Sequence, residues 1–170
     1  MIKKFRQLFE RQEWPKTDDD IKFDAIDFLI KDANVTAMIL MVENDIIDKT
    51  LSGKIIYFLY DIYESYHTRP TANIKMIYRL VKSILDKYKK LVDVVDGNGF
   101  SLLMNASYIS LDLALLVLDY NPDIFYRNPN NSNKDVFDMN ENLTLTSLKL
   151  RYPKLYNKYM KNKNMKKFNI

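Results

Sequence analysis

Apolar side chains recur along this chain at intervals of three and four residues, the spacing of one face of an α-helix. The clearest run extends from Ile74 to Tyr88, with Ile77, Val81 and Ile84 or Leu85 between them. The same spacing predicts about nine helical pieces, beginning with residues 2–12. Only three glycines and five prolines interrupt them, so the pattern predicts an all-α fold. The run at 74–88 also has a basic face, which we expect to be solvated: Lys75, Arg79, Lys82, Lys87 and Lys89.

Local residues indicate where several of these helices begin. Asp18, Asp19 and Asp20 precede an apolar series, and negative charge stabilises the N-terminus of a helix. Because the sequence identifies no further ligands, we interpret this triplet as capping and not as a metal site. Asn34 is expected to cap a helix that extends to about Glu43.

Beyond residue 92 the predicted helices are shorter, and polar turns at 96–99, 121–123 and 128–133 separate them. This pattern repeats. The segments 84–86 and 117–119 lie 33 residues apart, and each ends an apolar helix before a polar turn. A period of this length is typical of stacked helical hairpins. We place the hairpins near residues 18–48, 49–93, 96–127 and 128–163.

The best-defined of these units resembles an ankyrin repeat. Residues 96–107 are similar to the family's opening, an Asp and a Gly followed by Thr-Pro-Leu-His-x-Ala-Ala. Residues 111–124 resemble its outer helix and the Gly-Ala-Asp-Val exit. The sequence departs from the family where Leu102 replaces the proline, Met104 the histidine, and Ser110 stands near the expected glycine.

The resemblance implies a short solenoid of about four hairpins plus an N-terminal helix. It forms one domain over residues 1–163, followed by a basic tail at 164–170. Within the repeat, Gly99 permits the turn, Ser101 caps the inner helix and Ala106 lets two helices approach closely. Stacked repeats form extended recognition surfaces without reactive groups, so the implied function is a protein–protein interaction module.

The resemblance also implies which residues contact a protein partner, namely the variable positions of this repeat and the adjacent turn. Phe100 and Ile109 could instead pack in the core, because apolar residues are often buried. The abundant Ile, Lys, Asn and Tyr are typical of an AT-rich genome, where small ankyrin-like proteins resemble viral or parasite factors that bind a host protein. The expected contacts are Asn98, Phe100, Asn105, Tyr108, Ile109, Tyr126 and Arg127.

Charge is distributed unevenly around the net value of +4. Residues 17–64 contain 11 acids and 4 bases, whereas residues 142–170 contain eight bases and no acid. Tyrosines interleave with those bases, a composition typical of nucleic-acid contacts with stacking side chains. The segment could also be a solvated tail or an intramolecular partner of the acidic stretch. The alternative function is therefore nucleic-acid binding through Lys154, Lys158, Lys161, Lys163, Lys166 and Lys167.

The sequence carries no recognisable catalytic or cofactor motif. Cysteine is absent, which excludes disulfides, thiolate nucleophiles and zinc sites that need sulfur. The single histidine, His67, lies at an expected helix end without a nucleophile motif, so a capping or surface role is favoured. We expect a non-enzymatic protein without cofactor or metal. With no signal peptide and no apolar run near the roughly 20 residues of a membrane span, we expect an intracellular, cytoplasmic protein, the nucleus remaining open.

Overall fold

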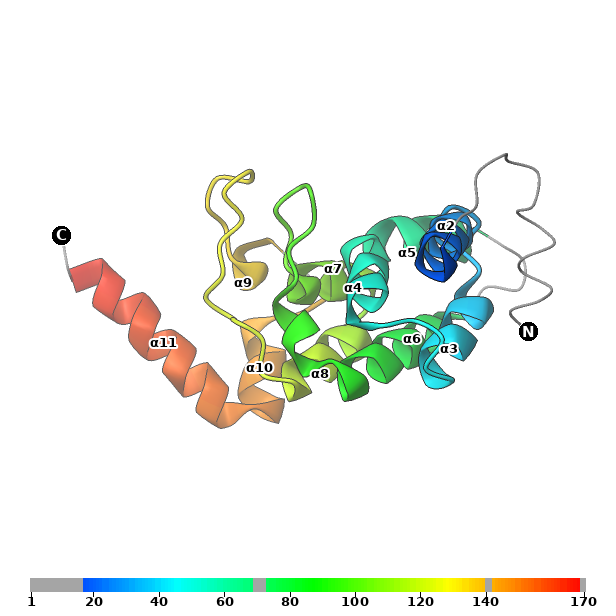
Figure 1. Cartoon of the computed structure of the whole chain (residues 1–170). Helices are drawn as coiled ribbons and strands as arrows, with labels where there is room; N and C mark the ends of the chain where they lie inside the picture. Colours follow the sequence, from blue (N-terminus) through cyan, green and yellow to red (C-terminus); the bar gives the residue numbers. More distant parts are fainter. Residues whose placement is uncertain (1–16, 69–72, 140–141, 169–170) are drawn as a thin grey trace. The chain divides into compact units, whose positions relative to one another are not determined.

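The computed structural model describes residues 17–68, 73–139 and 142–168, without the side chains of 165–168 (Figure 1). Every regular element in these ranges is a helix, apart from two isolated β-bridges. The predicted all-α class is thus confirmed. The helix expected at residues 2–12 lies outside the described part of the chain. The chain divides into two compact units, Met1–Tyr88 (unit 1) and Lys89–Ile170 (unit 2). The single domain expected over residues 1–163 stays a prediction.

Unit 1 begins with helices whose starts were predictable. Thr17 and Asp20 form a capping box at the start of α2, and the three acids occupy its first turn, which confirms the capping interpretation. The Asn34 side chain accepts a hydrogen bond from the Ala37 amide and caps the next helix, also as expected. The helices of its described residues are α2 (Asp18–Lys31), α3 (Val35–Glu43), α4 (Lys49–Tyr57), α5 (Leu59–His67) and α6 (Ile74–Lys87).

Helices α3 and α6 pack against each other in unit 1. The predicted apolar face of α6 is buried from Ile77 to Leu85, whereas Ile74 at its start is exposed. The basic face of α6 is only partly solvated, because two of its members bind the acidic C-terminal end of α3. Arg79 pairs with Glu43, and Lys87 pairs with Asp45 and the Val42 carbonyl oxygen.

Unit 2 contains shorter helices, and α7 and α8 form a tight hairpin. Ser101 caps α7 through the Met104 amide, and Ser110 ends α7 and caps α8. Ala106 and Ala114, one on each helix, are fully buried. The helices of this unit are η1 (Lys89–Asp93), α7 (Leu102–Ile109), α8 (Leu111–Asp119), α9 (Val136–Met139), α10 (Leu145–Arg151) and α11 (Pro153–Phe168).

Two narrow hairpin turns precede α7 and α9 and extend side by side in Figure 1. A bridge between Val95 and Ser101 closes the first turn (residues 95–101), and one between Asn128 and Lys134 closes the second turn (residues 128–134). Both ends of the second turn therefore lie 33 residues after those of the first. The structure repeats the turn with the period found in the sequence.

The basic C-terminal end differs from expectation. Residues 164–168, expected as part of a basic tail that follows the domain, continue α11 to Phe168. Positive side chains near a helix C-terminus interact favourably with the helix dipole, which favours this extension. Tyr159 on α11 is buried, and α11 packs against α10.

Candidate interaction surface

The first turn is organised by one carboxylate. Asp96 Oδ1 accepts hydrogen bonds from the backbone amides of Asn98 and Phe100, both at 2.9 Å. Its other oxygen accepts from the Asn105 side-chain amide on α7, also at 2.9 Å. A turn held by three such bonds has a fixed shape, and it is attached to the helix that follows it.

The second turn is bound directly to the first. The Asn128 side-chain amide donates to the Asn98 carbonyl oxygen at 3.2 Å, and the Tyr126 hydroxyl donates to the Gly99 carbonyl oxygen at 3.1 Å. Burial, with a smaller contribution from the Asp96 carboxylate, raises the pKa of Tyr126, so this hydroxyl stays protonated as a donor. These bonds fasten two segments about 30 residues apart into one paired structure.

Gly99 is required at the closest approach of the two turns. Its φ of +80° lies in the left-handed region that glycine tolerates best. A Cβ at this position would lie 2.5 Å from Oδ1 of Asn128, whose side chain is fully buried. The turn-forming role that the family resemblance implied for Gly99 therefore has a second basis, the close contact with Asn128.

Aromatic side chains lie on the surface next to the paired turns. The rings of Phe100 and Tyr108 make an edge-to-face contact, with centroids 5.9 Å apart. Tyr108 is 41% exposed, Phe100 is half-buried and Asn98 is exposed. We call these three residues the aromatic patch. Exposed tyrosine and phenylalanine held by a rigid scaffold are common anchors of protein interfaces.

Two of the expected partner contacts are not on the surface. Asn105 is 3% exposed because its side chain binds Asp96, and Ile109 is 7% exposed because it packs in the α7–α8 hairpin. Neither residue is therefore available to contact a partner. Ile109 packs in the core, which was the alternative considered for it. Tyr126 and Arg127 are half-buried and bind parts of the two turns, so they support the surface more than they form it.

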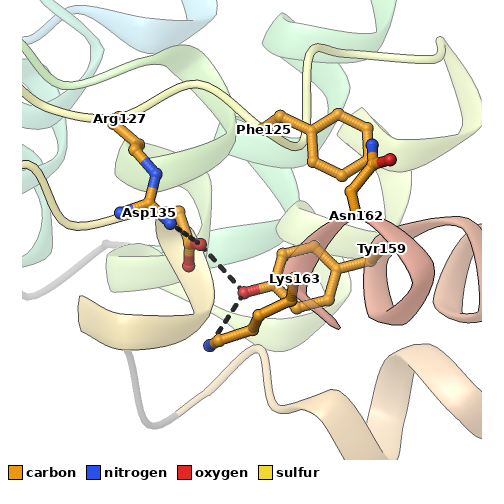
Figure 2. Close-up of a pocket in the computed structure, with 6 residues that line it drawn as sticks. All are labelled: Phe125, Arg127, Asp135, Tyr159, Asn162 and Lys163. Atoms are coloured by element: carbon orange, nitrogen blue, oxygen red, sulfur yellow. Dashed lines mark hydrogen bonds and ion pairs between the residues drawn. The ribbon is translucent and has the colours of Figure 1, made fainter. Parts of the chain in front are cut away.

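A small pocket lies between the second turn and α11 (Figure 2). The Tyr159 hydroxyl donates to Oδ2 of the buried Asp135 at 2.8 Å, and the Lys163 ammonium binds the Tyr159 oxygen at 3.2 Å. Arg127 approaches the same carboxylate oxygen of Asp135 at 3.6 Å. Asp135 Oδ1 accepts from the Phe137 and Asp138 amides and so caps α9. Asp135 thus joins α9, the second turn and α11.

The electrostatics of this pocket fit a structural role. Burial and the Asp135 carboxylate, opposed by Lys163, together raise the pKa of Tyr159 to about 12. Partial burial is the largest single influence on Asp138 and acts to raise its pKa. The hydrogen bond from Lys163, the charges of Lys163 and Arg127 and a backbone hydrogen bond to Asp135 together outweigh it and lower that pKa. The pocket holds about 20 Å³, room for about one water, whereas small-molecule sites are typically several hundred Å³. The geometry therefore serves to attach α11.

The lysines of α11 fall into different environments. Lys163 binds Asp138 at 3.1 Å and contacts Tyr159, so it is an internal partner. Partial burial acts to lower the pKa of Lys163, but the hydrogen bonds and the electrostatic attraction to Tyr159 and Asp138 together outweigh it and raise that pKa. Lys154, Lys158 and Lys161 are exposed. The helix includes Lys166 and Lys167, but their side chains lie outside the described part.

The single histidine of the chain contacts only its own helix in the described residues. His67 lies at the end of α5, where its Nδ1 is 3.0 Å from the Tyr63 carbonyl oxygen and its ring stacks on Tyr63. No group of three or more His, Asp or Glu side chains is placed to hold a metal ion in this part of the chain. Nor does any helix there have the length and apolar character of a membrane span.

No family model, curated protein or solved structure gives a significant match to the chain.

Sequence reasoning missed two residues on which the surface depends. Asn128 was expected only as part of a polar turn, and Asp135 was not among the candidate residues. Their partners, Asn98 and Tyr159, lie 30 and 24 residues away. A polar residue directly before a helix signals a cap, but nothing local indicates a second, distant partner.

Proposed function

We propose that this protein is a non-enzymatic protein-interaction module that binds its partner through the aromatic patch. The observation that carries the proposal is the pair of hairpin turns, 33 residues apart and hydrogen-bonded to each other, next to the exposed ring of Tyr108 and the half-buried ring of Phe100. Such a surface is ordered before binding, which reduces the entropy lost on association. It contains aromatic anchors and no reactive group.

We further propose that unit 2 is built from ankyrin-like repeats. Each turn leads into a capped helix: Ser101 caps α7, and Asp135 caps α9 after the second turn. In ankyrin-type solenoids, equivalent turns of successive repeats lie next to one another, and turn tips and inner helices form the recognition surface. The bonds from Asn128 and Tyr126 to the first turn support this arrangement.

The test is capture of partners from lysate, followed by mass spectrometry, with wild-type protein and two single variants. Tyr108→Glu places a charge in the aromatic patch. Tyr78→Glu makes the same change on α6 in unit 1, where the tyrosine is 38% exposed compared with 41% for Tyr108. We expect Tyr108→Glu to reduce capture of a specific partner at least tenfold, as losing a hot-spot tyrosine does, and Tyr78→Glu to retain it.

Both variants should remain folded and melt cooperatively, because both side chains lie at the surface, although Tyr108→Glu also loses the ring contact with Phe100. Equal capture by wild-type and Tyr108→Glu proteins would contradict the proposed surface. Loss of capture with Tyr78→Glu alone would instead assign recognition to unit 1.

A further inference from the structure

The excess positive charge of this chain is confined to one unit. Residues 1–88 contain 14 bases and 14 acids, whereas residues 89–170 contain 12 bases and 8 acids. The net charge of +4 therefore belongs to unit 2. Within unit 2 the bases gather on α10 and α11, and α11 carries six lysines and no acid.

Helical geometry divides the α11 lysines between two sides. Lys154, Lys158 and Lys161 follow one another at spacings of four and three residues, so they lie on one face about 6 and 4.5 Å apart along the axis. All three are exposed, and none forms an ion pair within the described residues. Lys163 lies about two and a half turns after Lys154 and hence on the opposite side, where it binds Asp138. We call Lys154, Lys158 and Lys161 the lysine stripe.

Several acidic side chains of unit 1 already have partners within that unit. Glu43 and Asp45 are held by Arg79 and Lys87 of α6. Asp27 pairs with Lys54 of α4. The acids at 18–20 are in the first turn of α2, where the helix dipole favours them. These acids are paired or capped within unit 1, and residues 1–88 carry no net charge, so the lysine stripe remains available to an external anion.

Two aromatic rings lie near basic side chains in this region, one of them next to a lysine of the stripe. The Lys158 ammonium is 5.7 Å from the centroid of the Phe125 ring, and the Lys149 ammonium is 5.8 Å from that of Tyr156. Rings next to lysines are the combination with which proteins bind single-stranded nucleic acid, the lysines contacting phosphates and the rings stacking on bases. An acidic peptide would use the charges but not the rings.

We propose that the lysine stripe is a second binding surface, which takes single-stranded nucleic acid without sequence preference by contacting its phosphates. This surface is separate from the aromatic patch, so either proposal can fail alone. Deleting α11 would not test it cleanly, because the deletion also removes Tyr159 from Asp135. Neutralising the stripe is the appropriate change.

The experiment measures fluorescence anisotropy of a labelled single strand of about 20 nucleotides at about 50 and 200 mM salt, with full-length proteins. The stripe variant is Lys154→Gln, Lys158→Gln and Lys161→Gln together. Its control removes the same charge from exposed lysines of unit 1, as Lys31→Gln, Lys49→Gln and Lys75→Gln together. Thermal melts establish that both variants fold.

Three phosphate contacts make wild-type affinity fall about 20-fold or more between the two salt concentrations. The stripe variant should bind at least tenfold more weakly at the lower salt, and its slope of log affinity against log salt should be about 2 smaller, while the control keeps the wild-type slope. An equal loss in the control, or wild-type binding by the stripe variant, would overturn the proposal. So would equally strong competition by polyglutamate of the same charge, which would indicate an acidic protein partner.

Discussion

The two units differ in how polar side chains hold them together. In unit 1 the long-range polar contacts between α3 and α6 include ion pairs at the surface, such as that of Arg79 with Glu43. In unit 2 the corresponding contacts come from polar side chains inside the protein, such as Asp135 and Asn128, which are 2% and 0% exposed. The first unit has polar pairs over an apolar core, whereas the second is organised around polar groups.

This difference has energetic and functional consequences. An exposed ion pair is solvated in both the folded and the unfolded state, so it contributes little to stability. A buried carboxylate or amide must keep its hydrogen bonds, because losing one leaves a group without water or partner. Unit 2 therefore has little freedom to rearrange its turns, which is what a preformed recognition surface requires.

The largest effect is expected from Asp135→Ala. This change removes the α9 cap and leaves Tyr159 and Arg127 without their shared carboxylate. We expect the free energy of unfolding of unit 2 to fall by about 3 kcal/mol in urea denaturation. The control is Asp138→Ala, which removes a more exposed carboxylate bound to Lys163 and should cost less than about 1 kcal/mol. Equal losses would break the contrast between buried and exposed carboxylates.

A smaller loss is expected from Gly99→Ala. The positive φ strains alanine, and its Cβ would displace Asn128. We expect a loss of about 2 kcal/mol in the same measurement. Gly97→Ala, in the same turn but without a positive φ, should change stability by less than about 0.5 kcal/mol. If Gly99→Ala left the free energy of unfolding unchanged, the two turns would not be in close contact.

Tyr159→Phe should cost about 1 kcal/mol, since it removes the hydroxyl that joins Asp135 and Lys163. The contribution of this hydroxyl to stability should depend on pH. The folded-state pKa of Tyr159, about 12, exceeds the unfolded value of about 10. The folded state therefore holds its proton longer, and this contribution to stability is full below pH 10 and is lost as the pH rises toward 12.

Absorbance titration of the phenolates should show one fewer tyrosine ionising near pH 12 in Tyr159→Phe than in the wild type, whereas the raised pKa of Tyr126 is common to both proteins. An equal number of tyrosines ionising near pH 12 in the two proteins would contradict the assignment to Tyr159.

The smallest effect is expected from Arg79→Met in unit 1, where the ion pair with Glu43 is exposed to solvent. The hydrogen bond from Arg79 lowers the pKa of Glu43, with desolvation opposing it. A lowered carboxylate pKa stabilises the folded state above the unfolded pKa of about 4.3, and the contribution is lost as the pH falls through the folded value. The difference between wild type and variant in denaturation should therefore shrink below about pH 4. A difference that grew toward low pH would contradict this pairing.

Local signals predicted helix starts well, because a cap and the amide it binds are only two or three residues apart. Asn34 and Ser101 cap the expected helices in this way. Long-range pairs such as Glu43 with Arg79, 36 residues apart, have no comparable signal. The sequence analysis therefore did not predict that two residues on the basic face of α6 form ion pairs with distant acids.

The candidate surface was predictable only in part. The repeat period located the two turns, but not the bonds that join them. Tyr108 and Ile109 are adjacent in sequence, yet one is exposed and the other buried, because neighbours on a helix point about 100° apart and the packing of α8 decides which is covered. Asn105 has the polarity of a surface residue and is buried by its bond to Asp96.

Amide hydrogen exchange tests the central claim most directly, with the chain measured alone and with its captured partner. The aromatic patch lies on the first turn and α7, so the partner should slow exchange in peptides covering residues 96–109. Peptides from α3, residues 35–43, act as the internal reference from unit 1 and should be unchanged. Slowed exchange at 35–43 without any change at 96–109 would contradict recognition by the aromatic patch.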